Sequence, residues 1–144
     1  MGLNAERIVD AAHQLLNQYG LHDVSMRRIA AALEVKPGAL YYHVPNKQQL
    51  LHRVAERALQ PLTEDEADPA ELMARFRRLL LDLRDGGDLM LLAYAVEPEL
   101  PPVPQLAQGF TRRGFSAEQA LKRAVVVVRP GLGLITVEQN AALL

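Results

Sequence analysis

Apolar residues recur at helical spacing along almost the whole chain, and this pattern limits the fold more than any other feature. The clearest stripe lies within residues 4–19 and consists of Ile8, Ala12, Leu15, Leu16 and Tyr19. Leucine and alanine, which are strong helix formers, must fill most of the core because the chain has three Phe, four Tyr and no Trp. The sequence therefore predicts an all-α fold.

Capping residues and helix breakers divide the first sixty residues into four predicted helices. Gly20 ends the first helix, and Ser25 is a good N-cap for the second. After a break at Glu34, Pro37 suits the first position of a third helix of about seven residues. The fourth helix begins after the cap Asn46 and ends near residue 61.

An acidic, proline-flanked segment, residues 61–68, predicts the domain boundary. It separates a domain of residues 1–60 from a second helical domain of residues 69–144. The first sixty residues hold seven Lys or Arg against five Asp or Glu, whereas the remainder holds nine against twelve. The whole chain has a net charge of −1, so this asymmetry indicates two domains with different roles.

The second domain has a less regular pattern. Asp68 and Ser116 are N-caps with Glu or Gln three residues later, which predicts a helix after each of them. Pro130 predicts that the second of these helices ends near Val128. Between them we expect a turn at residues 85–88 and a buried apolar helix at 89–96. A loop with four prolines follows at 97–104, and a further helix ends at 114.

Several classes of function are excluded by what the chain lacks. Without cysteine there is no disulfide framework, thiolate metal site or cysteine nucleophile. No zinc-binding His-Glu-x-x-His, phosphate-loop or Gly-x-Ser-x-Gly motif is present, so we expect no enzyme, no metal and no cofactor. The N-terminus does not look like a signal peptide, and the most apolar stretch, residues 124–137, is too short to span a bilayer. These features predict a cytoplasmic protein with no membrane partner.

Cations at two predicted helix starts indicate an anionic partner. Arg27 and Arg28 follow the cap Ser25, and Lys47 directly follows the cap Asn46. Cations in a first turn oppose the helix dipole, at a cost of about 0.3–1 kcal/mol each. The free N–H groups at the same place attract anions such as phosphate. The alternative is that these long side chains simply extend into water.

The predicted third helix has the residue types of a DNA probe. Small residues at its start allow close approach to base edges, and the rings that follow can donate hydrogen bonds to phosphate oxygens. A tight turn joins it to the second helix, as in a helix-turn-helix. The alternative for the two tyrosines is packing within the domain. The segment consists of Lys36, Pro37, Gly38, Ala39, Leu40, Tyr41, Tyr42 and His43.

Residues 5–59 resemble the DNA-binding domain of the TetR family of bacterial regulators. The matching segments are VSMRRIA at 24–30, LEV at 33–35, GALYYHV at 38–44, NK at 46–47 and LL at 50–51. The resemblance implies a homodimer on a palindromic double-stranded DNA operator, with one recognition helix in each major groove. It implies that Arg27 reads guanine, that residues 36–39 face the bases, and that phosphates are contacted by Tyr41, Tyr42, His43 and Lys47.

One residue departs from the family pattern in the turn between the second and third helices. TetR-like proteins usually have Gly there, where this chain has Glu34. If the position needs a positive φ, Glu costs on the order of 1 kcal/mol.

The second domain is similar to the effector domain of tetracycline repressors. This similarity is carried by Phe76 and by residues 84–86, 105–106, 114–116 and 120–121. It implies a small molecule held between helices. The alternative for each of these residues is a place in the ordinary core of a helical bundle.

The pocket implied by this resemblance does not match tetracycline. Phe76 and Gln105 agree with pocket positions, but Leu72, Thr63 and Met90 replace an Asn and two His that hold the drug and its magnesium. A thioether is a poor ligand for a hard cation. We therefore expect no magnesium–tetracycline response, but a more apolar small effector bound by Leu72, Phe76, Met90 and Gln105.

Together these features predict a ligand-responsive transcriptional regulator that acts as a repressor. The effector is expected to shift the fifth helix and, through the linker and fourth helix, to change the separation of two DNA-binding domains. The alternative is a DNA-binding module whose second domain only assembles subunits. Compared with the family, the chain is expected to lack the last dimerisation helices.

Overall fold

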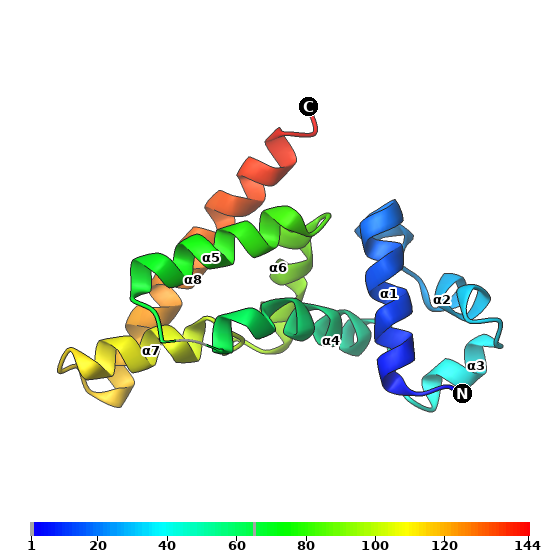
Figure 1. The fold of residues 1–144 in the computed structure, drawn as a ribbon, viewed down its shortest axis with the longest axis horizontal. Coiled ribbons are helices and arrows are strands. Elements are labelled where there is room, and N and C mark those ends of the chain that lie inside the picture. The colour runs from blue at the N-terminus through cyan, green and yellow to red at the C-terminus, as the bar shows by residue number, and fades with distance from the viewer. Residues whose placement is uncertain (1, 65) are drawn as a thin grey trace.

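The computed structural model describes residues 2–64 and 66–144, and these residues form helices and no strands (Figure 1). The first group comprises α1 (Ala5–Tyr19), α2 (Met26–Ala32), α3 (Pro37–Tyr41) and α4 (Lys47–Leu59). The second group comprises α5 (Pro69–Asp82), α6 (Gly86–Val96), α7 (Val103–Arg112) and α8 (Ala117–Ala141). Short 3-10 helices at Leu21–Asp23 and Gln60–Thr63 follow α1 and α4. The predicted all-α fold is confirmed.

The predicted N-caps hold the helix starts as expected. Ser25 Oγ accepts a hydrogen bond from Arg28 N at 3.1 Å, and Asn46 Oδ1 accepts one from Gln49 N at 2.8 Å. Ser116 and Gln119 form a reciprocal capping box at the start of α8. Each cap satisfies an N–H group that has no partner inside its helix.

The turn between α2 and α3 adopts the backbone conformation that glycine would favour. Glu34 has φ 57°, within the left-handed region. Leu40 and Val44 are fully buried behind the turn and anchor the segment against the rest of the domain. α3 has five residues rather than the predicted seven, since Tyr42 and His43 already belong to a turn.

The region around α6 differs from the sequence-based expectation in three ways. Gly86 to Asp88, predicted as a turn, form the first turn of α6. Leu91 and Leu92, predicted to be buried, are 50% and 49% exposed because only one side of α6 faces the core. The proline-rich loop ends earlier than predicted, because α7 begins at Val103 and accepts Pro104 in its first turn, where a missing N–H costs nothing.

α8 does not end near Val128 but continues through Pro130 to Ala141. A proline inside a helix costs about 3 kcal/mol because it removes a hydrogen bond and crowds the preceding turn. Here the buried stripe of Ala124, Val128, Leu132 and Ile135 continues past the proline at helical spacing. Packing of this stripe against α5, α6 and α7 outweighs the local cost.

The two helical groups share a continuous apolar core. α4 packs against α1 on one side and α6 on the other, and it runs between the two groups in Figure 1. Buried residues from both groups, such as Leu50 and Leu89, belong to a single cluster. Of the segment predicted as the linker, Asp65 lies outside the described residues. No described helix is both long enough and apolar enough to cross a membrane.

Candidate nucleic-acid interface and ligand cavity

The aromatic residues of the α3 segment lie on the surface. Tyr41 is 50% exposed and Tyr42 is 89% exposed, whereas Leu40 between the turn and the rings is fully buried. The rings of Tyr42 and His43 meet edge to face, with centroids 5.1 Å apart. Neither tyrosine is a core residue, so the packing alternative for these two side chains is wrong.

The cations near α3 fall into two groups. Arg28 is held by the protein, because its Nη1 lies 3.7 Å from Asp23 Oδ1 and its guanidinium lies 5.7 Å from the centre of the Tyr19 ring. Arg27 and Lys36 are exposed, whereas Lys47 is half-buried. None of the three forms an ion pair with another described residue. These three cations are available to an external anion.

Gly38 occupies the outer surface of α3 for no reason internal to the protein. A Cβ atom added to it would meet no atom within 4 Å, and its φ is not positive. Pro37 and Ala39 beside it are also exposed. A glycine in a helix loses stability relative to alanine, but the missing Cβ would allow another molecule to approach the backbone closely.

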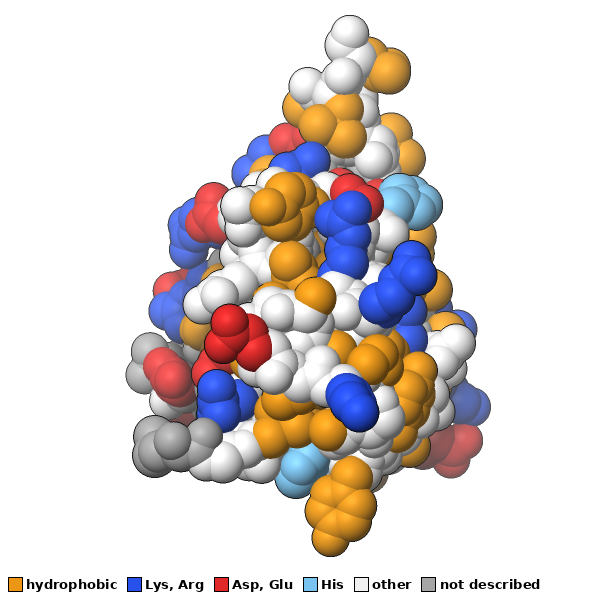
Figure 2. Space-filling model, turned by 90° about the vertical axis from the view of Figure 1, so that its right-hand side faces the viewer, with side chains coloured by type: hydrophobic (Ala, Val, Ile, Leu, Met, Phe, Trp, Pro, Cys, Tyr) orange, Lys and Arg blue, Asp and Glu red, His pale blue; other side chains and the backbone are white. Residues whose placement is uncertain are grey.

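Figure 2 views the molecule from the side on which α1–α3 lie in Figure 1. Lys and Arg side chains spread over the centre of this face, and a large orange side chain projects beyond its lower edge. Such a combination of exposed cations and aromatic side chains suits a phosphate backbone.

Three contacts that the sequence did not indicate fix this face relative to the second helical group. Leu21 N donates to Asp85 Oδ2 at 2.8 Å, and Arg84 Nη1 donates to the carbonyl of Gln18 at 2.8 Å. His52 of α4 meets Glu97 at the end of α6, with Nε2 and Oε2 2.6 Å apart. These contacts join residues 45–66 positions apart, so only the folded chain reveals them.

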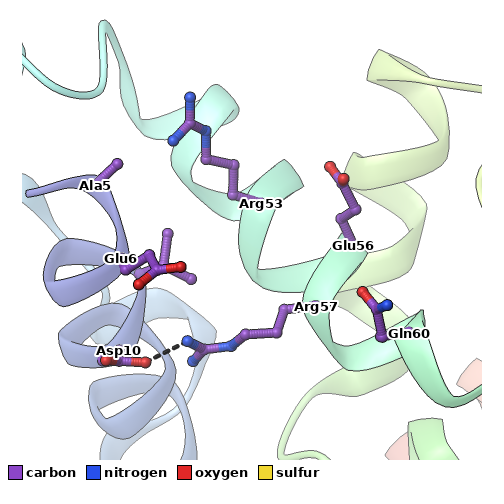
Figure 3. A pocket seen from close by; sticks show the side chains of 8 residues that line it. Ala5, Glu6, Asp10, Arg53, Glu56, Arg57 and Gln60 are labelled. Atoms are coloured by element: carbon purple, nitrogen blue, oxygen red, sulfur yellow. Dashed lines mark hydrogen bonds and ion pairs between the residues drawn. The ribbon is translucent and has the colours of Figure 1, made fainter.

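A hollow of about 650 Å³ between α1 and α4 is lined mainly by charged side chains (Figure 3). Asp10 and Arg57 form an ion pair across it. Glu6, Arg53 and Glu56 complete a lining in which acids and bases alternate. This hollow has no dominant charge and no sequence-predicted site residue.

His13, next to this ion pair, gives the α1–α4 contact a pH dependence. Partial burial, then the charge of Arg57, lowers the pKa of His13 below its ordinary value of 6.5, although Asp10 opposes the change. Since the unfolded chain takes up this proton more readily, the contribution to stability is complete above pH 6.5 and declines below it. We expect the unfolding free energy to fall less between pH 7.5 and 5.5 in His13→Gln, measured by urea titration. Equal losses in both proteins would contradict the assignment.

The four residues predicted to bind a ligand do not lie together. Leu72 and Gln105 line a cavity of about 190 Å³ between the Gln60–Thr63 segment, α5 and α7. Phe76 and Met90 are fully buried in the core and do not line it. Phe76 instead packs edge to face on Tyr94, at 6.4 Å between ring centres. The other lining residues are mostly polar, namely Thr63, Glu64, Glu66, Ala67, Gln108 and Arg112.

The comparisons with known proteins agree with the geometry of α2 and α3. Residues 8–54 match the family described as bacterial regulatory proteins, tetR family. Over 96% of its length the chain is 31% identical to the class D tetracycline repressor protein of Escherichia coli, and the match covers 67% of that repressor. The chain belongs to the TetR family. It is therefore a transcriptional regulator and not an enzyme.

Solved structures of TetR-family proteins show the same arrangement of an N-terminal helix-turn-helix and a helical second domain. BioQ with its natural double-stranded DNA operator superposes with a TM-score of 0.85 at 33% identity, covering 98% of this chain and 89% of that chain. A tetracycline repressor variant from Acinetobacter baumannii in complex with minocycline superposes with a TM-score of 0.81 at 26% identity, covering 97% and 78%.

Proposed function

We propose that this TetR-family regulator is a cytoplasmic homodimeric repressor that binds a palindromic operator through α3. The observation that carries the proposal is the set of groups on α2, α3 and α4, in which the exposed Tyr41 and Tyr42 and three available cations accompany a glycine with open space before it. Of the predicted contact residues, Ser25 and Arg28 have internal partners. We therefore assign to these two residues a structural role at the interface rather than direct contacts with bases.

We further propose that residues 1–60 form the DNA-binding domain, that 61–68 link it to 69–144, and that the latter respond to a small effector other than magnesium–tetracycline. Apolar side chains exposed on α6 and α8, including Leu92, Leu134 and Val137, support a second copy as the dimer partner. In such a dimer the two α3 helices would lie about 34–36 Å apart, one turn of DNA. Because α4 packs on α6 and meets Glu97 through His52, a ligand-driven shift reaches α3 by this route.

Two substitutions test the division between base and phosphate contacts. Arg27→Ala is expected to relax base preference and to weaken operator binding by about 1–3 kcal/mol. Lys47→Ala is expected to weaken operator and random duplexes alike and to reduce the salt dependence of binding. Fluorescence anisotropy with both duplexes at several salt concentrations measures these effects. Arg78→Ala is the matched control, since it removes an exposed arginine of α5, outside the helix-turn-helix. If both test variants affect the two duplexes equally, the division of roles is wrong.

A second candidate role for the second domain is assembly alone, which the exposed apolar side chains of α6 and α8 also favour. The two roles differ in their response to small molecules. A sensor is stabilised by some ligand and then releases its operator, whereas an assembly domain shows neither effect in a broad thermal-shift screen.

A further inference from the structure

The cavity lined by Leu72 and Gln105 is small and partly enclosed. Its volume of about 190 Å³ lies below the usual 300–1,000 Å³ of sites for drug-sized ligands. Leu72 is 2% exposed and forms an apolar wall. The rest of the described lining consists of Thr63, Glu64, Glu66 and Ala67, from the segment that follows α4, and of Gln108 and Arg112 from α7.

Gln105, which also lines the cavity, has a side-chain oxygen without a hydrogen-bond partner. Its Oε1 atom is shielded from solvent and accepts no hydrogen bond from any described residue. A buried acceptor without a donor costs about 1–3 kcal/mol, and buried polar groups in folded proteins are paired as a rule. Because Gln105 lines the cavity, a molecule bound there could supply the missing donor.

Two carboxylates that line the cavity differ in whether they form an ion pair. Glu66 lies 3.9 Å from Arg112 Nη1 and is thereby partly neutralised. Glu64 lines the same cavity and forms no ion pair with any residue of 2–64 or 66–144. The described lining residues thus include two carboxylates and one arginine, and the excess negative charge favours a cation.

We infer that the effector of this cavity is a small organic amine with a hydrogen-bond donor at its other end, rather than the apolar molecule that the sequence predicts. Its N–H or O–H donor pairs with Gln105 Oε1, its apolar middle contacts Leu72, and its ammonium group faces Glu64. An apolar ligand would cover the Gln105 oxygen without pairing it and would remove water from Glu64, both of which oppose binding. This assignment depends on the effector role proposed above.

Tyramine, which has a phenol donor, an apolar ring and an ammonium group, is a suitable probe for the full chain. Its matched controls are 4-ethylphenol, which lacks the ammonium, and 3-(4-hydroxyphenyl)propionate, which reverses the charge. We expect tyramine alone to raise the melting temperature and, in calorimetry, to bind at least about tenfold more tightly than either control. Stronger or equal stabilisation by a control, or stabilisation by none of the three, would overturn the inference.

Substitutions of Glu64 and Gln105 test whether tyramine binds in this cavity. Glu64→Gln and Gln105→Leu are each expected to weaken tyramine binding about tenfold, whereas Gln105→Glu retains an acceptor and is expected to preserve it. Glu99→Gln, at an exposed carboxylate outside the cavity, is the control for charge. Unchanged tyramine binding in Glu64→Gln and Gln105→Leu would also overturn the inference.

Operator binding by the unliganded chain is measured in parallel. If the chain binds DNA but not tyramine, the ligand class is wrong while DNA recognition stands. If it binds no duplex, the proposed function fails whatever the amines do.

Discussion

Replacing Gly38 with alanine is expected to stabilise the protein and to weaken its binding to operator DNA. A Cβ at this position meets no atom of the protein within 4 Å. Alanine also restricts the unfolded chain, so the free energy of unfolding should rise by up to about 0.5–1 kcal/mol. If α3 enters a DNA groove as proposed, the same Cβ points into the space that base edges or sugar atoms would occupy, and DNA binding should therefore fall.

A larger effect is expected for Gly38→Glu. A carboxylate in the first turn of a helix interacts favourably with the helix dipole, so the fold should be retained. Next to phosphates the same charge is repelled, and its effect does not depend on base sequence. We expect the alanine variant to lose about tenfold in operator affinity and the glutamate variant to lose at least about a hundredfold, toward non-specific levels.

Urea titration and fluorescence anisotropy at one fixed salt concentration measure the two effects separately. Gly109→Ala is the matched control, because Gly109 also lies within a helix, α7, and a Cβ added there meets only ordinary contacts at 3.8 Å. It should raise stability without changing DNA affinity. If Gly38→Ala and Gly38→Glu bind the operator as the original chain does, α3 is not the element that enters the groove.

The features predicted correctly from the sequence are those determined by neighbours within a few residues. The caps at Ser25, Asn46 and Ser116 each bond to an N–H three residues later, so the sequence alone contains both partners. Comparison at a single turn position likewise showed that Glu34 would be costly if its φ were positive, and its φ is 57°. The exposed residues of α3 follow from the same local pattern, because Leu40 alone must point inward.

The features that the sequence did not indicate depend on contacts between distant segments. Pro130 predicts a helix end, but the apolar stripe of α8 continues beneath it and packs on three other helices. Phe76 and Met90 were expected in a ligand pocket, yet an apolar residue suits a pocket wall and a core equally well, and the structure buries both in the core. Glu64 and Gln105 line one cavity although they are far apart in the sequence.

Gln139 is the clearest residue whose role depends on contacts between distant segments. Replacing it with leucine is expected to destabilise the protein strongly. From α8, its Nε2 donates to the carbonyls of Leu80 at 3.0 Å and Leu83 at 2.9 Å, while its Oε1 accepts from Gly87 N at 2.9 Å. One amide thus satisfies backbone groups at the end of α5 and the start of α6. Leucine removes all three hydrogen bonds and takes away the side-chain partner of Gly87 N, although the Leu83 carbonyl still accepts from Gly86 N at 2.9 Å. The expected cost is about 2–4 kcal/mol in the free energy of unfolding.

Two further variants show whether the hydrogen bonds, and not the packing, account for this cost. Gln139→Glu keeps the acceptor for Gly87 but turns a carboxylate toward two carbonyl oxygens, so it should be at least as destabilising at pH 7 and recover as acid protonates it. Asn140→Ala removes an exposed amide that donates to Asp88 at 3.3 Å and to the Thr136 carbonyl at 3.1 Å, and it should cost less than about 1 kcal/mol. Equal costs for Gln139→Leu and Asn140→Ala in urea titration would refute the bridging role.

The α5–α6 turn, which Gln139 contacts, also connects the stability of the second domain to DNA binding. Arg84 and Asp85 lie in the same α5–α6 turn and contact the end of α1 through Gln18 and Leu21. If Gln139 holds the turn in place, Gln139→Leu should also loosen the DNA-binding domain from the second domain. The expected result is weaker coupling between effector and operator even at temperatures where the variant remains folded, whereas Asn140→Ala should leave that coupling unchanged.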